Sequence, residues 1–229
     1  SNISISGCHF DNNQQGWYSD ANTDTEPDLD QVSIVNTTFS GNALKGFYTE
    51  RLSNAIFDGI TVNNSGSSSY AWGAGIDINL KWKDYSNIEV LNSTFSNCGI
   101  GSANGVGLTI KARDDGSSYG ANAATLQNVS ITANSFSANN LAIAIGEPGK
   151  NNAGPTLVSI SNNSLINSVT NEINNNSQAN VVATCNWYGS PIDNTIASKI
   201  SGPVTYSPYL ISAGTNNNPG FTPDPGSCL

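Results

Sequence analysis

Six charged or hydrogen-bonding side chains recur at alternate positions in three segments that are expected to be β-strands. They are Glu50, Asp77, Asn79, Thr109, Lys111 and Arg113. If these segments lie side by side, outward side chains on neighbouring strands are ~5 Å apart and would line a polysaccharide groove. Lys111 or Arg113 would then be the base of a β-elimination lyase, which removes the C5 proton of a uronate sugar. Glu50 and Asp77 would be the carboxylates of a glycosidase, which lie about 5–9.5 Å apart.

We call these six residues the polar stripe. A non-catalytic interpretation of the stripe is favoured. The stripe ends in Ala142 and Ala144 on the next such segment, and the flanking loops are rich in Ser and Gly. Charged residues on a sheet most often form a solvated face. The single histidine, His9, lies between Cys8 and Phe10 and is interpreted as an ordinary surface residue. We therefore assign no catalytic residue and keep the charged members of the stripe as the alternative.

Aromatic side chains accompany the stripe, mostly in segments that interrupt the strands. Loops on a rigid scaffold are where binding usually resides, although the same rings also suit packing at corners. The residues expected to contact a ligand are Trp17, Tyr18, Tyr48, Trp72, Asp77, Asn79, Trp82 and Lys111.

A run of acidic residues extends from Asp20 to Asp30. Calcium needs six to eight oxygen ligands in a defined turn, and this spacing matches no twelve-residue calcium loop with its Gly and terminal Glu. We interpret the run as a solvated acidic loop. The prediction is therefore no cofactor and no metal site, with calcium in this loop as the alternative.

An internal repeat predicts how these residues are positioned. Two β-branched or small apolar residues at alternate positions are followed by a large apolar residue seven positions after the first. The copies start at Ile3, Val32, Ala55, Ile88, Val129, Val158 and Val181. Alternation with period two indicates strands, and long helical periodicities are absent from the sequence.

The spacing of the copies indicates a chain that closes on itself. Consecutive starts are 29, 23, 33, 41, 29 and 23 residues apart, which fits a coil of ~23 residues with insertions at its corners. The sequence contains 34 Asn and 22 Gly, and corner amides in register can bond from coil to coil. We predict an all-β parallel β-helix of about seven coils over residues 1–210, with a Pro/Gly-rich extended tail over residues 211–229. An antiparallel β-sandwich is the alternative, although its strands would lack a common phase.

Two segments also carry a resemblance. Residues 128–136 (Asn-Val-Ser-Ile-Thr-Ala-Asn-Ser-Phe), together with Cys185–Gly189 and Ile200–Leu210, resemble the repeats and closing coil of right-handed parallel β-helix proteins of secreted bacterial origin, the pectate-lyase-like superfold. The resemblance covers nearly the whole chain and implies a right-handed coil from a multi-domain cell-surface protein. It does not settle activity, because this superfold includes lyases, hydrolases, adhesins and inert stalks. No motif of a polygalacturonase or pectate lyase active site is found.

Four cysteines divide into two pairs. A disulfide between Cys185 of the closing segment and Cys228 of the tail would fasten the tail to the final coil. Cys8 and Cys98 are separated by three coils, roughly 14 Å at ~4.8 Å per coil, which is beyond disulfide reach. We predict that these two are reduced and buried, unless Cys8 pairs across a contact between molecules.

Composition limits the partners and the location. The formal charge of −9 argues against a nucleic-acid partner, and no apolar run is long enough to span a membrane. Few Lys, many Asn and four Cys favour a secreted or cell-surface protein. Seven Asn-x-Ser/Thr triplets, the acceptor pattern for N-linked glycans, are present at Asn2, Asn36, Asn63, Asn92, Asn128, Asn162 and Asn175. With Asn this frequent, coincidence explains them unless the source glycosylates its surface proteins.

The favoured function is a structural or adhesive module. The first coil has no capping helix, so copies of the chain or adjacent domains would contact its edge and could form filaments. The alternative is a carbohydrate-active enzyme or a polysaccharide-binding domain, a lyase or glycosidase of the same superfold. A third class, ice binding, would use the outward Ser4, Ser33, Ser130 and Ser159, a row that Glu89 interrupts.

Overall fold

The computed structural model describes residues 2–119 and 121–229, and most of its regular structure is β-strand. Three parallel sheets account for it. Sheet A contains β1 (Ile3–Ser6), β3 (Leu29–Val35), β6 (Leu52–Asp58), β9 (Asp84–Leu91), β12 (Thr125–Thr132), β15 (Thr156–Ser161), β18 (Val181–Val182) and β20 (Val204–Thr205). Sheet B contains β4 (Thr38–Ser40), β7 (Thr61–Asn63), β10 (Thr94–Ser96), β13 (Ser135–Ser137) and β16 (Ser164–Ile166). Sheet C contains β2 (Gln15–Ser19), β5 (Lys45–Thr49), β8 (Ala74–Lys81), β11 (Val106–Arg113), β14 (Ile143–Ile145), β17 (Ile173–Asn175) and β19 (Ile200–Ser201).

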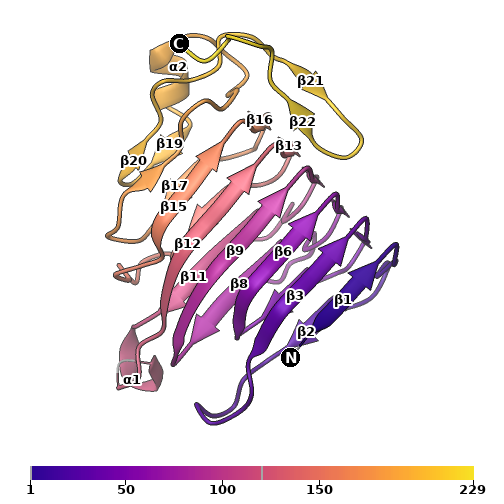
Figure 1. Ribbon diagram of the computed structural model, residues 1–229, viewed down its shortest axis with the longest axis vertical. Helices are drawn as coiled ribbons and strands as arrows, with labels where there is room; N and C mark the ends of the chain where they lie inside the picture. Colours follow the sequence, from indigo (N-terminus) through magenta and orange to yellow (C-terminus); the bar gives the residue numbers. More distant parts are fainter. Residues whose placement is uncertain (1, 120) are drawn as a thin grey trace.

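From β3 to β17 the chain visits the sheets in a fixed order, A then B then C, and each strand pairs with the next one of its sheet (Figure 1). We call one such circuit a coil. Along sheet A the seven predicted starting residues are in register, since Ile3 pairs with Val32, Val32 with Ala55, and so on to Val181. This confirms the all-β, parallel arrangement and excludes the antiparallel sandwich. The arrangement is compatible with a β-solenoid.

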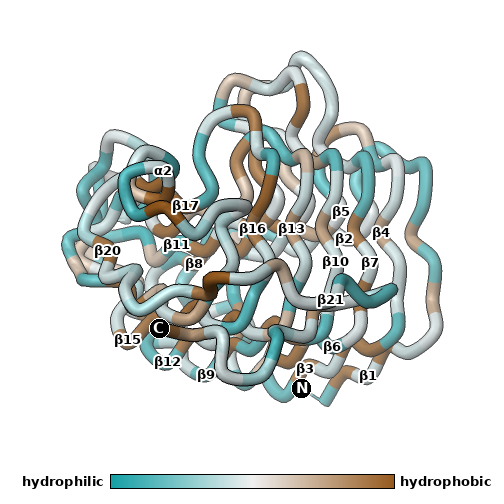
Figure 2. The backbone as a smooth tube through the Cα atoms, turned by 90° about the horizontal axis from the view of Figure 1, so that it is seen from above, coloured by the Kyte–Doolittle hydropathy of each residue, from teal (hydrophilic) through white to brown (hydrophobic). Residues whose placement is uncertain are grey.

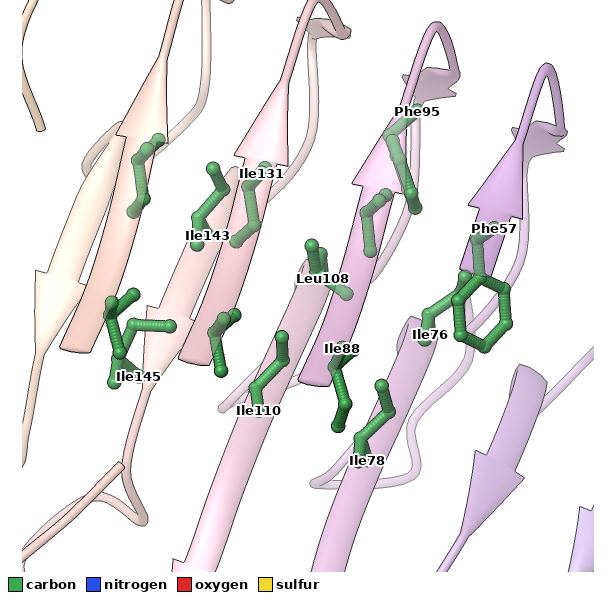
Figure 3. Packing of buried hydrophobic residues seen from close by; sticks show 14 of the residues in the cluster. Phe57, Ile76, Ile78, Ile88, Phe95, Leu108, Ile110, Ile131, Ile143 and Ile145 are labelled. Atoms are coloured by element: carbon green, nitrogen blue, oxygen red, sulfur yellow. The ribbon is translucent and has the colours of Figure 1, made fainter. Parts of the chain in front are cut away.

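The core lies between the sheets and is built from stacked rows. The ring of Phe10 stacks on that of Phe39 at 5.2 Å, and Phe95 stacks on Phe136 at 4.6 Å. Val62 lies in register between Phe39 and Phe95, so these side chains form one continuous column. Figure 3 shows side chains of sheets A and C filling the same interior. Each coil buries its apolar residues only because the next coil covers them.

Left-handed backbone positions, at corners and within sheet A, account for part of the abundance of asparagine. Among the described residues, 17 non-glycine residues have positive φ, and 11 of these are Asn. Left-handed backbone is costly for most side chains and least so for Gly and Asn. Figure 2 shows the coils side by side, with hydrophilic stretches recurring at corners.

Buried amides join consecutive coils at the corner between sheets A and B. Asn134 donates through Nδ2 to Oδ1 of Asn163 (3.0 Å), and Asn163 donates in the same way to Asn186 (2.9 Å). All three side chains are fully buried. On the corner between sheets B and C, Cys98 occupies the amide position, and its backbone N–H donates to Oδ1 of Asn139 (2.9 Å).

The C-terminal segment folds back along the coils. The sequence predicts an extended tail, but β21 (Thr215–Asn216) and β22 (Phe221–Thr222) form an antiparallel hairpin. Phe221 is buried, and its N–H donates to the carbonyl of Ala133 (2.8 Å). A short helix, α2 (Asp193–Ala197), lies in the last coil, and α1 (Gly116–Tyr119) lies in the insertion after β11.

The predicted disulfide between Cys185 and Cys228 is confirmed, with their Cα atoms 5.1 Å apart. Cys8 and Cys98 are free, as predicted, and Cys98 is fully buried whereas Cys8 is half-buried. A disulfide is typical of an oxidising, extracellular environment. Within the described residues, no helix has the length and apolar character needed to cross a membrane.

Candidate functional site

Register on sheet C brings the polar stripe together. Asp77 pairs with Tyr48 on one side and Thr109 on the other, and Asn79 pairs with Lys111. These residues alternate with apolar neighbours such as Ile76 and Ile78 that face the core. The stripe therefore lies on the outer surface of sheet C, because side chains alternate between the two faces of a strand.

The stripe is not a solvated face, in contrast to the sequence interpretation. Only 1% of Asp77 and 5% of Lys111 is exposed, and Glu50 and Lys45 are equally buried. Long side chains from adjacent coils and from the loops cover one another. Buried charges require partners, and the structure supplies them within the stripe.

Asp77 is the centre of the first set of ion pairs. Its carboxylate contacts the ammonium groups of Lys45 and Lys111, the latter at 2.9 Å. Lys111 also contacts Oε2 of Glu147 at 3.2 Å. Lys111 therefore bridges two carboxylates that come from different coils.

These contacts set the proton affinities. Burial alone would raise the pKa of Asp77, but the ammonium groups of Lys111 and Lys45 outweigh it and lower that pKa. Burial would lower the pKa of Lys111, but the carboxylates of Asp77 and Glu147 raise it instead. For Lys45, burial prevails over the attraction of Asp77, and its pKa is lowered. Asp77 and Lys111 are thus held in their charged forms.

Arg113 belongs to a neighbouring pair. Its Nε and Nη2 donate to the two carboxylate oxygens of Asp115, at 2.8 and 3.0 Å. The hydrogen bonds from Arg113 are the main cause that lowers the pKa of Asp115 to about 2. A third nitrogen, Nη1, donates to Oδ1 of Asn79 at 3.2 Å. Arg113 is fixed in place by this two-pronged contact.

Glu50 has a separate set of partners. Its carboxylate contacts the ammonium of Lys81 and accepts hydrogen bonds from the Tyr48 hydroxyl and from the N–H of Ala21 (2.6 Å). The Tyr48 hydroxyl in turn accepts from Asn79 at 3.3 Å. Glu50 and Asp77 therefore belong to different ion-pair sets, although the sequence grouped them as one carboxylate pair.

Three adjoining clefts lie over these residues. The Leu141 cleft has a volume of ≈ 200 Å³, and the Arg113 and Tyr18 clefts have ≈ 170 Å³ each. The first two share Trp72, Asp77 and Lys111. The second and third share Lys45, Tyr48 and Tyr70. Together they form one groove, the sheet-C groove, which runs across the strands from coil to coil.

Most of the residues expected to contact a ligand line this groove. Besides Asp77, Asn79 and Lys111, they include Tyr18, Tyr48 and Trp72. Two predicted aromatics do not line it. Trp17 is in register with Phe47 and stacks on it at 5.9 Å, so it packs on the core. Trp82 lies beside Tyr119 of α1, 6.4 Å between ring centroids.

The lining residues that the sequence did not single out include Lys45, Glu147 and Tyr70. Lys45 lies at the start of a weak strand pattern, and Glu147 lies two positions after Ile145, where the alternation of β14 would continue. That alternation would place Glu147 on the core-facing side with Ile145, so it gave no sign of a groove residue; the strand ends at Ile145, and Gly146 has a positive φ of 77°. Tyr70 lies in an irregular insertion and carries no such signal.

The acidic loop is held by two basic side chains. Arg51 donates to the carbonyls of Thr23 and Glu26, and Lys83 contacts Asp28 at 3.0 Å. Over residues 2–119 and 121–229, no group of three or more His, Cys, Asp or Glu side chains is arranged to hold a metal ion. The prediction of no metal site, with calcium in this loop as the alternative, stays a prediction.

The seven glycan acceptors differ in accessibility. Asn36, Asn92 and Asn128 are exposed at the surface. Asn175 is buried, and its Nδ2 donates to the carbonyls of Ala179 and Pro203, both at 2.8 Å. Glycan attachment at Asn175 would require that coil to open.

Comparison of the chain with protein-family models, with curated proteins and with solved structures found no match. The function must therefore be inferred from the geometry of the sheet-C groove.

Proposed function

We propose that the chain is a right-handed parallel β-helix module of a secreted or cell-surface protein, and that it adheres to a polysaccharide along the sheet-C groove. The seven starting residues in register support the coil. The disulfide supports an oxidising location. The resemblance of the closing segment to the pectate-lyase-like superfold supports the handedness.

The observation that carries the binding proposal is the continuity of the groove. The clefts are joined by shared residues and extend across neighbouring coils, so a long polymer can follow them. Aromatic rings line the whole length: Trp72 at the Leu141 cleft, Tyr48 and Tyr70 in the middle, and Tyr18 at the far end. Tyr18 stacks on Tyr48 at 5.3 Å and is 53% exposed. Flat rings beside hydrogen-bonding groups suit sugar rings, which have both apolar and polar faces.

The fixed charge states of the groove residues favour binding without catalysis. The raised pKa of Lys111 and the lowered pKa of Asp77 keep both groups charged near neutral pH. A general base or acid must exchange its proton near the working pH. Arg113, whose pKa is raised by Asp115 and Glu147 against the effect of burial, is no better suited.

One observation favours a lyase as the second candidate. Burial lowers the pKa of Lys45, and the charge of Lys111 lowers it further against the effect of Asp77. Lys45 also lines the middle of the groove. If the protein is a lyase, Lys45 is the residue best placed to accept a proton.

Affinity electrophoresis on neutral and anionic polysaccharides, with and without calcium, tests the proposal. We expect retardation by at least one polysaccharide, and a weakening of at least tenfold in Trp72→Ala. Trp82→Ala is the matched control, because Trp82 lies outside the clefts. Failure of every polysaccharide to retard the protein would refute the proposal. Release of unsaturated products or new reducing ends, lost in Lys45→Gln, would replace it by the lyase.

A separate observation favours contacts at one end. In the described chain, β1 pairs only with β3 and β2 only with β5, so one edge of each strand is open to another strand. A copy of the chain or an adjacent domain would fit there. Sedimentation and electron microscopy would detect filaments, and a strictly monomeric chain at high concentration would exclude self-stacking.

A further inference from the structure

We propose that the Leu141 cleft is a subsite for an N-acetylated hexosamine residue of the bound polysaccharide. This inference rests on the proposed function and names its substrate class. It is carried by an apolar floor, by hydrogen-bonding groups with spare capacity and by the size of the cleft.

The floor of the cleft is apolar, although it lies on the outer face of sheet C. Ala74, Val106, Leu141 and Ala144 form a cluster that is separate from the main core, and all four line the cleft. In this row of outward positions Ala144 pairs with Thr109, which pairs with Asp77. The stripe thus changes from charged to apolar within two coils.

Such a floor fits a small apolar substituent on a sugar. The methyl of an acetamido group would lie on the four aliphatic side chains and leave water. A uronate carboxylate in the same place would lose hydration against an apolar surface, which is costly. The floor therefore selects an acetylated sugar over an acidic one.

Hydrogen-bonding groups surround the floor. The side chains of Asn104 and Asn176 and the hydroxyl of Thr109 line the cleft, and in the described part of the chain none of them bonds to another protein group. An amide side chain can donate and accept, as the N–H and C=O of an acetamido group require. Trp72 flanks the cleft and provides a ring face for the pyranose.

The volume fits one sugar residue. The ≈ 200 Å³ of the cleft is below the ≈ 300–1,000 Å³ of pockets that hold drug-sized ligands, as expected for a single sugar residue. Its open side continues into the Arg113 cleft, which shares Trp72, Asp77 and Lys111. The polymer can therefore leave the subsite along the groove.

Titration calorimetry with two oligosaccharides of equal length tests the subsite. Chitin and cellulose oligosaccharides differ only in the acetamido or hydroxyl group at C2. We expect the chitin oligosaccharide to bind at least tenfold more tightly. Ala144→Leu fills the floor and should abolish this preference, and Asn176→Ala, a less disruptive change at a half-buried side chain, should reduce it. Ala213→Leu, in the exposed tail, is the matched control.

The outcomes separate the two proposals. Equal affinity for both oligosaccharides would overturn the subsite and leave polysaccharide binding intact. Binding of other polysaccharides but of neither oligosaccharide would also overturn the subsite alone. Failure of every glycan to bind would overturn both. A preference that persists in Ala144→Leu, with unfolding midpoints showing a folded variant, would place the acetamido group elsewhere and overturn the inference.

Discussion

Asn163 donates its side-chain amide to Oδ1 of Asn186, 2.9 Å away, and both residues are fully buried between consecutive coils. Asn163 also donates to the carbonyl of Ile131 (2.9 Å), and its Oδ1 accepts from the N–H of Asn134 (2.8 Å). One side chain therefore satisfies polar groups of three coils. Such a network is stable only when each member has its partners.

Asn163→Ala should lower the free energy of unfolding by about 2–4 kcal/mol, because it leaves several buried polar groups without partners. Chemical denaturation measures this change. Ser159→Ala, at an exposed outward position of β15, is the control and should stay within about 0.5 kcal/mol of the parent. A loss below about 1 kcal/mol for Asn163→Ala would show that the ladder contributes little.

A column of left-handed residues in sheet A suggests a stabilising substitution. Asn54, Asn87 and Asn128 have positive φ, and their amides bond in series, at 2.7 Å and 3.2 Å. On the next coil the equivalent position is occupied by Leu157, which has a φ of 53° and is 68% exposed. A branched apolar side chain in this conformation costs roughly 1 kcal/mol.

Leu157→Asn should therefore raise the free energy of unfolding by about 0.5–1 kcal/mol, since Asn tolerates this backbone and can extend the amide series to Asn128. Leu157→Ala keeps the unfavourable backbone and removes only the exposed apolar group, so it serves as the control. Denaturation midpoints that are equal for the two variants would contradict the backbone argument.

Lowering the pH should reduce the free energy of unfolding, because Asp115 becomes protonated. Its pKa of about 2 is below the unfolded value of ~3.9, so the native state holds the proton less tightly than the unfolded chain. The stabilisation is complete above about pH 4 and is lost as the pH falls through 2. Because solvent beside this half-buried carboxylate screens the ion pair, we expect only about 1–2 kcal/mol from this group. In Asp115→Asn the pH dependence of the unfolding midpoint should flatten between pH 4 and 2. Asp24→Asn, in the acidic loop, should retain the parent slope, and a parent slope in Asp115→Asn would contradict the assignment.

The disulfide should hold the tail on the coils. It joins residues 43 positions apart, and a loop of this length corresponds to about 4 kcal/mol in the chain-entropy model. A reductant or Cys228→Ser should lower the unfolding midpoint and make the chain around Phe221 susceptible to proteolysis.

The two free cysteines should differ in reactivity. Without a reductant, a thiol reagent should label one cysteine in the folded protein, Cys8, and two after unfolding. Burial raises the pKa of Cys98 to about 12, so rapid labelling of Cys98 in the folded state would contradict the packing.

The repeat could be read from the sequence because each coil must satisfy the same local requirements. Alternating apolar residues mark the strand at Val32 and Ile34, and Asn or Gly marks corners that need left-handed backbone. These requirements recur at each coil and do not depend on insertion length. The same alternation placed Asp77 and Lys111 on the outer face.

The sequence could not predict the partners within the site. Spacings of 23 to 41 residues hide which residues of sheet C meet, so Lys45 and Glu147 were not connected with Asp77. Trp17 is expected from the sequence to contact a ligand, although it is in register with Phe47 and packs on the core. The burial of the charges also depends on loops whose paths no local pattern specifies.

Local periodicity by itself thus determined the strands, their faces and the order of the coils, since those features follow from neighbours a few residues apart. Only the tertiary structure decided that Lys111 bridges Asp77 and Glu147, that the stripe is buried and that its clefts join into a groove. Those contacts connect residues 34 to 36 positions apart, and their geometry depends on how each coil seats on the next.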